Sequence, residues 1–310
     1  MHDLLVAIIL GVVEGVTEFL PVSSTGHLLL CERWMGLRLE DGFWSMFTVF
    51  IQIGAIAAVV VYFRGRILEL LRGQPERILT PLEISASARP GEKVIHGDGG
   101  GAGAEVMADD TPPTAAQRGY AILMIALAST PLAVAYFAEK WAEANMKSPW
   151  MVPGALIVGG VLMTLIEWMP LNVTTRRIER ITWKQALGIG GAQVLAAIFP
   201  GTSRSAATIM AGLVGGLSRP AAAEFSFFLA IPAMGAACGY KLLKFLNAGV
   251  PAVSQMLLLV IGTLVSFLVA WGVIALFMGY IRRHSFVPFA LYRIGLGVVV
   301  ILILRSAGGD

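Results

Sequence analysis

The stretch that decides the fold of this chain is EGVTEFLPVSSTGH, from Glu14 to His27, together with a second stretch, PGTSRSAAT, from Pro200 to Thr208. Both are polar, and both lie within long apolar surroundings that would otherwise be predicted to cross a membrane. A single charge at the centre of a membrane helix costs roughly 2.5 to 3.5 kcal/mol on insertion scales, so such groups usually mark a buried functional site. We therefore expect the two stretches to meet and to carry the chemistry of the protein.

The composition around these stretches is that of a membrane protein. Of the 310 residues, 56% are hydrophobic and only 14% are charged, and the mean hydropathy is +0.75. A soluble domain carries about 25% charged residues. The net charge of +3 comes from basic residues in the loops, which indicates membrane topology and no nucleic-acid partner. We predict an all-α integral membrane protein that crosses the membrane several times.

Six apolar segments have the length of about 20 residues that a membrane-spanning helix needs. They are Phe43–Phe63, Gly119–Ala138, Trp150–Met169, Pro220–Tyr240, Gln255–Met278 and Val287–Leu304. We predict that each of them forms one transmembrane helix.

Two further pairs of apolar segments do not fit that length. They are Leu4–Leu20 with Ser23–Cys31, and Gln185–Phe199 with Ser203–Gly216. Each pair is interrupted by a proline, whose ring removes a backbone donor and clashes with the preceding turn. A broken helix is tolerated in a membrane only where protein or an aqueous cavity covers the freed backbone groups. We predict two re-entrant helical hairpins, in which hydroxyl side chains after the proline cap the second helix and its N-terminus forms an anion site.

The two halves of the sequence resemble each other. Aligning the two prolines places Glu14 on Gln193 and Ser24 on Ser203, and three predicted spans follow each hairpin. An odd number of spans between the hairpins inverts the second copy relative to the first. This is the inverted-repeat plan, in which broken helices converge on a site near the bilayer midplane.

The chain is predicted to be a single membrane domain over residues 1–310, with repeat one at about 1–138 and repeat two at about 185–305. The segment 73–117 includes GDGGGAGAEVMADDTPPT, which has the composition of a flexible loop insert with no catalytic part. Arginine and lysine are concentrated in the loops that would lie on one side of the membrane. This excess predicts that both termini lie outside.

The first polar stretch supplies acidic and basic groups. Glu14 and Glu18 are four positions apart, so a helix would hold them on one face. Two carboxylates held together suit a hard divalent cation such as Mg²⁺ or Ca²⁺, and a shared proton is the competing interpretation. His27 follows a run of hydroxyl residues, one turn into the next predicted helix, and is a candidate for catalysis.

The second polar stretch supplies the complementary charge. Arg204 lies between Ser203 and Ser205 and shortly after Gly201. Its planar guanidinium next to hydroxyls and backbone amides is a combination that suits phosphate oxygens. A structural ion pair with one of the two glutamates is the alternative, and the two roles are compatible.

These motifs, with FxxxIQxGAI at Phe47–Ile56 and AAAEFSFFLAIP at Ala221–Pro232, resemble those of the undecaprenyl-diphosphate phosphatase family of the bacitracin-resistance type. The similarity covers nearly the whole chain except residues 73–117. It implies a multi-pass enzyme of the bacterial inner membrane that removes the terminal phosphate from a C55 isoprenyl diphosphate. The product, undecaprenyl phosphate, is the carrier lipid for peptidoglycan synthesis. The resemblance also suggests a homodimer.

The resemblance also implies roles for individual residues. The implied catalytic residues are Glu14, Glu18, Ser24, His27 and Arg204. Glu14 and Glu18 would hold the divalent cation. The implied substrate-binding residues are Ser23, Thr25, Gly201, Thr202, Ser203, Ser205 and Thr208. The nucleophile stays open between Ser24 assisted by His27 or Glu18, His27 itself, and a metal-bound water.

Two other classes of function stay open. Inverted repeats and broken helices are transporter architecture, so the chain is also compatible with a transporter or flippase of an anionic lipid or small anion. A non-catalytic scaffold would leave the buried charges unexplained. Acid, hydroxyl, imidazole and guanidinium groups in two facing loops exceed what anion binding alone requires, which favours hydrolysis.

Overall fold

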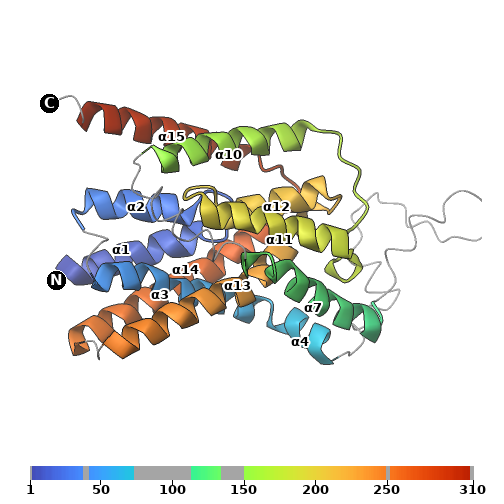
Figure 1. The fold of residues 1–310 in the computed structure, drawn as a ribbon, viewed down its shortest axis with the longest axis horizontal. Coiled ribbons are helices and arrows are strands. Elements are labelled where there is room, and N and C mark those ends of the chain that lie inside the picture. Colours follow the sequence, from blue (N-terminus) through green and yellow to red (C-terminus); the bar gives the residue numbers. More distant parts are fainter. Residues whose placement is uncertain (1, 38–41, 73–112, 134–149, 249–251, 308–310) are drawn as a thin grey trace, which may run out of the picture.

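The computed structural model describes residues 2–37, 42–72, 113–133, 150–248 and 252–307 (Figure 1). In these residues the regular structure is helical, and the β contacts amount to one isolated bridge between Thr175 and Leu217. The prediction of an all-α protein is therefore confirmed for the part of the chain that the structure describes.

Within the described residues, five helices are long and apolar enough to cross a membrane. They are α3 (Phe43–Tyr62), α10 (Met151–Trp168), α13 (Arg219–Ala248), α14 (Val253–Ile281) and α15 (Val287–Ala307). They match five of the six predicted spans. The sixth, Gly119–Ala138, begins inside the shorter helix α7 (Ala115–Ser129), and its part after residue 133 lies outside the described residues. Most of the loop 73–117 also lies outside them.

Two pairs of shorter helices occupy the positions of the predicted hairpins. Hairpin one consists of α1 (His2–Thr17) and α2 (Ser24–Trp34), and hairpin two of α11 (Trp183–Ile198) and α12 (Arg204–Val214). The two helices of each pair pack against each other. Figure 1 shows hairpin one at the end of the molecule that carries both chain termini, whereas hairpin two extends from the centre toward the opposite end. The hairpins thus enter from opposite ends.

The tips of the two hairpins repeat one backbone geometry. Ser23 and Ser203 have φ angles of 75° and 71°, and they are the two non-glycine residues with positive φ in the described part of the chain. The Ser23 hydroxyl accepts a hydrogen bond from the amide of Gly26 at 3.3 Å, and that of Ser203 accepts one from Ala206 at 3.2 Å. Each serine therefore caps the helix that follows it.

This geometry corrects the alignment of the two halves. Ser203 is equivalent to Ser23 and not to Ser24, because the second tip has one residue more between its proline and its capping serine. The first helical residues of α2 and α12 are then Ser24 and Arg204. The proline alignment could not detect the added residue, since hydroxyl residues fill both registers.

Each hairpin packs on the other half of the chain. Helix α1 packs against α14, and α11 packs against α7; α3 contacts α14 and α13, while α10 pairs with α15. Small residues let the backbones approach closely. A Cβ atom added to Gly11 would lie 2.7 Å from the carbonyl oxygen of Gly262, and one added to Gly15 would lie 2.8 Å from that of Ser266. The first hairpin is therefore fixed closely against α14.

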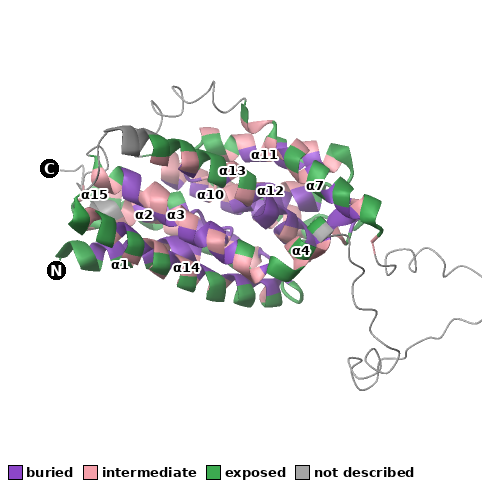
Figure 2. Ribbon diagram, turned by 90° about the horizontal axis from the view of Figure 1, so that it is seen from below, coloured by how far each residue is buried: buried purple, intermediate pink, exposed green. Residues whose placement is uncertain are grey.

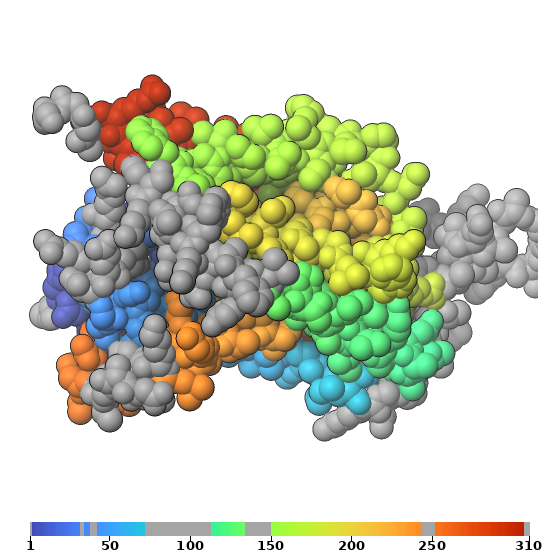
Figure 3. Space-filling view, in the orientation of Figure 1, coloured from blue at the N-terminus to red at the C-terminus, as the bar shows by residue number. Residues whose placement is uncertain are grey.

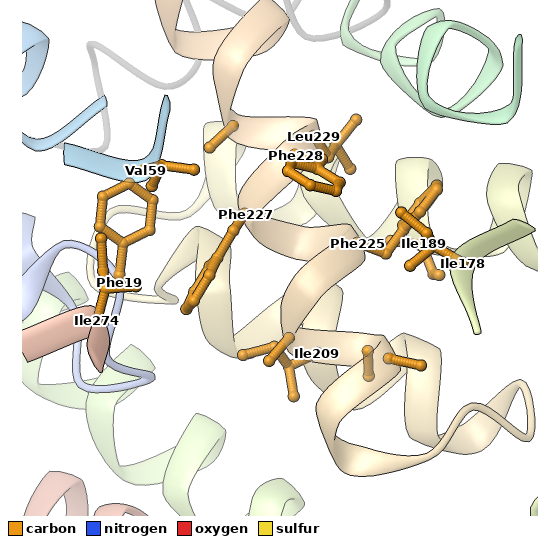
Figure 4. Packing of buried hydrophobic residues seen from close by; sticks show 14 of the residues in the cluster. Phe19, Val59, Ile178, Ile189, Ile209, Phe225, Phe227, Phe228, Leu229 and Ile274 are labelled. Atoms are coloured by element: carbon orange, nitrogen blue, oxygen red, sulfur yellow. The ribbon is translucent and has the colours of Figure 1, made fainter. Parts of the chain in front are cut away.

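The buried residues lie inside the helical assembly (Figure 2). Figure 4 shows Phe19 between Val59 and Ile274, with Phe227 beside it, and the rings of Phe19 and Phe227 meet edge to face with centroids 5.1 Å apart. Outward-facing side chains are also apolar. Leu257, Val260, Leu264 and Leu268 on α14 are all more than half exposed, and their spacing places them on one helical face. Such a face suits lipid.

An ion-pair cluster ties three elements together away from the tips. Arg66 on α4 (Arg64–Arg72) lies 2.9 Å from the carboxylate of Glu224 on α13 and 2.6 Å from that of Glu179 on the 3-10 helix η1 (Ile178–Arg180). Burial lowers the pKa of Arg66, but the two carboxylates outweigh this effect and raise it above its ordinary value. The arginine is therefore permanently charged and serves as a structural cross-link.

Candidate functional site

The two hairpin tips meet at one cavity of about 280 Å³. Six of its lining residues were predicted from the sequence: Glu18, Ser24, Thr25, Gly201, Ser203 and Arg204. The others are Gln52, Leu132, Gln193, Ala196, Ala197, Ala233, Met234 and Ala237. The expectation that the two polar stretches meet is therefore confirmed.

Glu18 joins the two hairpins at this cavity. One of its oxygens, Oε1, accepts a hydrogen bond from Nη2 of Arg204 at 3.1 Å, and the other, Oε2, accepts one from the hydroxyl of Ser24. Glu18 directly follows α1, and Ser24 and Arg204 are the first residues of α2 and α12. The broken helices therefore bring together an acid, a hydroxyl and a guanidinium at their ends.

The Arg204 side chain is held on two sides. Its Nη1 donates to the carbonyl of Ser226 on α13 at 3.2 Å, and the guanidinium carbon lies 5.7 Å from the ring centroid of Phe19, within the range of a cation–π contact. Its Nε has no hydrogen-bond partner in the described residues. The guanidinium group of Arg204 is therefore oriented before a ligand binds, and its Nε–H is available to donate to that ligand.

The predicted substrate-binding hydroxyls fall into different environments. Thr25 is exposed at the cavity, whereas Ser205 and Thr208 are buried. The hydroxyl of Ser205 donates to the carbonyl of Leu20 at 2.8 Å, which links the two tips directly. Thr208 contacts the hydroxyl of Ser226 at 2.6 Å. Ser205 and Thr208 therefore support the site through contacts with neighbouring segments, while Thr25 lines the cavity itself.

Thr202 does not line this cavity. It borders a separate apolar groove of about 560 Å³ between α10 and the end of α11. In the space-filling view, α10 lies beside the yellow segments that contain α11 and α12 (Figure 3). Ser23 is buried and acts as a helix cap.

Glu14 lies one turn before Glu18 and is fully buried. Its carboxyl group interacts electrostatically with that of Glu18, yet neither oxygen of Glu14 has a donor in the described residues, and the side-chain amide of Gln193 is also without a partner. Adjacent carboxyl groups with no donor between them require a proton or a cation. These unpaired oxygens fit a hard divalent cation.

The two glutamates alone are too few to complete the coordination shell of a metal ion. No group of three or more His, Cys, Asp or Glu residues that could hold a metal occurs within the described ranges. A cation at the two glutamates would therefore need oxygen ligands from amides, water or substrate as well.

His27 is not among the residues that line the cavity. Its Nδ1 lies 2.7 Å from the carbonyl oxygen of Ser23, and its Nε2 lies 2.7 Å from the hydroxyl of Tyr292 on α15. The two rings are stacked, with centroids 5.6 Å apart. Both imidazole nitrogens are thus engaged, and the structure brings His27 to α15 and not to the cavity.

The sequence reasoning missed Arg293 on α15. Its side chain is fully buried and donates to backbone carbonyls of both tips and of α10. The signal was available, because Arg293 is a charge inside the predicted span Val287–Leu304. It is the same energetic anomaly that marked the two polar stretches.

Comparison with known proteins adds to this geometry. Residues 7–299 match the family described as bacitracin resistance protein BacA. The undecaprenyl-diphosphatase of Koribacter versatilis is 38% identical over 312 residues, which cover 97% of this chain and 98% of that protein. The undecaprenyl-diphosphatase of Sorangium cellulosum is 39% identical over 95% of this chain and 84% of its own length. That of Enterococcus faecalis is 38% identical over 97% of both.

Proposed function

The chain belongs to the BacA family, and we propose that it hydrolyses undecaprenyl diphosphate to undecaprenyl phosphate and inorganic phosphate. The reaction recycles the lipid carrier of peptidoglycan synthesis, and such an activity confers resistance to bacitracin. The relatives named undecaprenyl-diphosphatase support the substrate. The observation that carries the proposal is the contact of Glu18 with both Ser24 and Arg204 at a cavity between two helix N-termini.

The diphosphate binds where positive charge converges. Arg204 supplies a planar set of donors, and the amides at the starts of α2 and α12 supply the partial positive charge of helix N-termini. Phosphoryl transfer depends mainly on positioning and on neutralising charge. Arg204 shifts from Glu18 to a phosphate oxygen when the substrate enters, and this frees Glu18 to act as a base.

Ser24 is the nucleophile that the contacts favour. Its hydroxyl donates to Glu18, so Glu18 takes the proton while the Ser24 oxygen bonds to the terminal phosphorus. The bond to the bridging oxygen breaks, and the polyprenyl phosphate leaves with the proton from Glu18. Water then attacks the phosphoserine, Glu18 accepts its proton, and the proton returns to Ser24 as inorganic phosphate is released.

A divalent cation, Mg²⁺ or Ca²⁺, would be held by Glu14 and Glu18. The unpaired oxygens of Glu14 support this assignment. When bound, the cation would neutralise charge on the diphosphate. Glu14 would then orient Glu18 from one turn away, within the buried end of α1.

The arrangement in the membrane is proposed in the same terms. Six spans and two re-entrant hairpins would form an inverted repeat in the bacterial inner membrane, with both termini outside. The two hairpins enter from opposite ends of the molecule (Figure 1), which supports a repeat of opposite orientation. Labelling of Arg305→Cys in intact cells by a membrane-impermeant thiol reagent tests the location of the C-terminus. A homodimer remains a prediction, which native mass spectrometry in detergent tests.

The test of the activity is phosphate release from a polyprenyl diphosphate by the purified protein in detergent. We expect release by the wild type, loss of release with EDTA, and recovery when Mg²⁺ or Ca²⁺ is added. Release that EDTA leaves unchanged would favour the shared proton over the cation. Binding of the diphosphate without any release, under every metal condition, would favour transport and overturn the proposal.

A further inference from the structure

Arg293 contacts three separate segments around the site. Its guanidinium donates to the carbonyl of Pro21 in the first tip at 3.3 Å and to those of Gly201 and Thr202 in the second tip at 3.3 and 2.9 Å. It also donates to Ala155 at 3.1 Å and Leu156 at 3.4 Å on α10. All five acceptors are backbone carbonyls.

The charge of Arg293 has no carboxylate partner in the described residues. In the part of the chain that the structure describes, this charge is balanced by carbonyl dipoles, three of which belong to the residues between the two helices of a hairpin. Hydrogen bonds from a charged donor are stronger than those between neutral groups. Arg293 therefore faces the carbonyl side of the two helix breaks, whereas the starts of α2 and α12 face the cavity.

The surroundings are shaped to accept this guanidinium. A Cβ atom added to Gly159 on α10 would collide with the Arg293 side chain. A Cβ atom added to Gly201 would lie 2.8 Å from the carbonyl oxygen of Val152, so α10 and the second tip are in close backbone contact. Arg293 makes five hydrogen bonds, and the surrounding atoms leave its side chain no room to move. It therefore fixes the positions of the segments that it joins.

We propose that Arg293 is a positioning residue that holds the two hairpin tips in register, so that Glu18 and Ser24 on one tip face Arg204 on the other. The inference rests on the proposed hydrolysis for its kinetic consequence. Its structural content, a rigid connection between the tips, is independent of the reaction. Arg293 does not line the cavity, and it acts through the residues that do.

The kinetic test compares Arg293→Met, Arg293→Lys and Gly159→Ala. Arg305→Met is the matched control, because Arg305 is exposed on the same helix. We expect Arg293→Met to lower kcat about 100-fold, as a small misplacement of reacting groups does, with KM within about threefold of the wild-type value. Arg293→Lys should recover part of the loss because it keeps the charge. A raised KM with unchanged kcat would instead assign Arg293 to substrate binding and overturn the proposal.

The structural test needs no activity. Spin labels at Trp34→Cys on α2 and Val214→Cys on α12, with Cys31 and Cys238 changed to alanine, report the distance between the two hairpins. Both labelled positions are more than half exposed. We expect a narrow distance distribution in the wild type and in Arg305→Met, and a broader one in Arg293→Met and Gly159→Ala.

An equally narrow distribution in all folded variants would overturn the proposal, even if kcat falls. If the wild type shows no hydrolysis but Arg293→Met broadens the distribution, the proposed function fails and the positioning role stands. If Arg293→Met does not fold, Arg293→Lys and Gly159→Ala carry the same test, because both keep a buried positive charge.

Discussion

The two hairpin tips share a backbone and differ in chemistry. Ser23 and Ser203 have nearly the same φ and cap their helices in the same way. The next residue is Ser24 in one tip and Arg204 in the other, and both reach Glu18. The repeated geometry supplies two helix starts at one cavity. A single side-chain difference at the first helical residue gives one tip the proposed nucleophile, Ser24, and the other the proposed phosphate-binding group, Arg204. The site is therefore chemically asymmetric, although the two tips share one backbone geometry.

The largest effect on activity is expected when Arg204, the proposed phosphate-binding group of the second tip, is removed. We expect Arg204→Ala to lower kcat/KM by about 10³-fold or more, as loss of a charge-stabilising arginine does in phosphoryl transfer. Arg204→Lys should recover little, because an ammonium lacks the planar fork that contacts Ser226 and Glu18 together. Phosphate release at several substrate concentrations measures both variants. Wild-type rates in Arg204→Ala would mean that the second tip is structural only.

The next change removes the nucleophile and its base from the first tip. Glu18→Gln should lower kcat by about 10²- to 10⁴-fold, since general-base assistance of that size is lost. Ser24→Ala should lower kcat at least as much, because it removes the proposed nucleophile. Ser306→Ala is the matched control, because its exposed hydroxyl donates to the carbonyl of Ile303 on α15 and Ser306 does not line the cavity. An acid-stable phosphoenzyme at Ser24 would sharpen the comparison. An acid-labile one would assign the nucleophile to His27 instead.

A smaller effect is expected for the hydrogen-bonded pair of His27 on α2 and Tyr292 on α15. His27→Gln and Tyr292→Phe each remove one hydrogen bond between α2 and α15, which contributes about 1 kcal/mol and so about fivefold in rate. The double variant should be no worse than the more impaired single variant, because both lose the same contact. A loss in His27→Gln as large as in Ser24→Ala, with little change in Tyr292→Phe, would contradict a supporting role for His27.

The smallest effects should distinguish the serine caps. Ser23→Ala and Ser203→Ala lose the cap and keep the positive φ, so each should destabilise the protein by about 1 kcal/mol. Ser23→Gly and Ser203→Gly lose the cap but tolerate the positive φ, and should be close to the wild type. Thermal unfolding in detergent measures the four variants. If alanine and glycine behave alike at either position, the backbone geometry there is not what the serine provides.

The sequence was sufficient for features that depend on apolar length or local chemistry. The five described spans follow from segment length, and both helix breaks follow from Pro21 and Pro200. An ion pair of Arg204 with one of the two glutamates was predicted as an alternative, and the structure shows that pair with Glu18. These are short-range or energetic constraints, which a sequence carries directly.

Features that depend on the packing of distant helices were not foreseen. Tyr292 engages His27 and Arg293 engages both tips only because α15 lies against α10 and the tips. The second tip has one residue more than the first between its proline and its capping serine. The sequence alignment did not show this, because hydroxyl residues occupy the neighbouring positions in both tips. The burial of Ser205 and Thr208 likewise depends on contacts with Leu20 in the first tip and with Ser226 on α13.

The close approach of α1 and α3 to α14 divides the glycines into two classes for anyone engineering a more robust protein. Replacing a helical glycine by alanine normally adds about 1 kcal/mol of stability. At Gly11, Gly15 and Gly54 the added methyl group would meet the backbone of α14, so the gain becomes a loss. At Gly235 and Gly272, where no atom of the described residues lies within 4 Å of an added Cβ, the gain remains available. Stabilising substitutions should therefore start on the outer faces of α13 and α14.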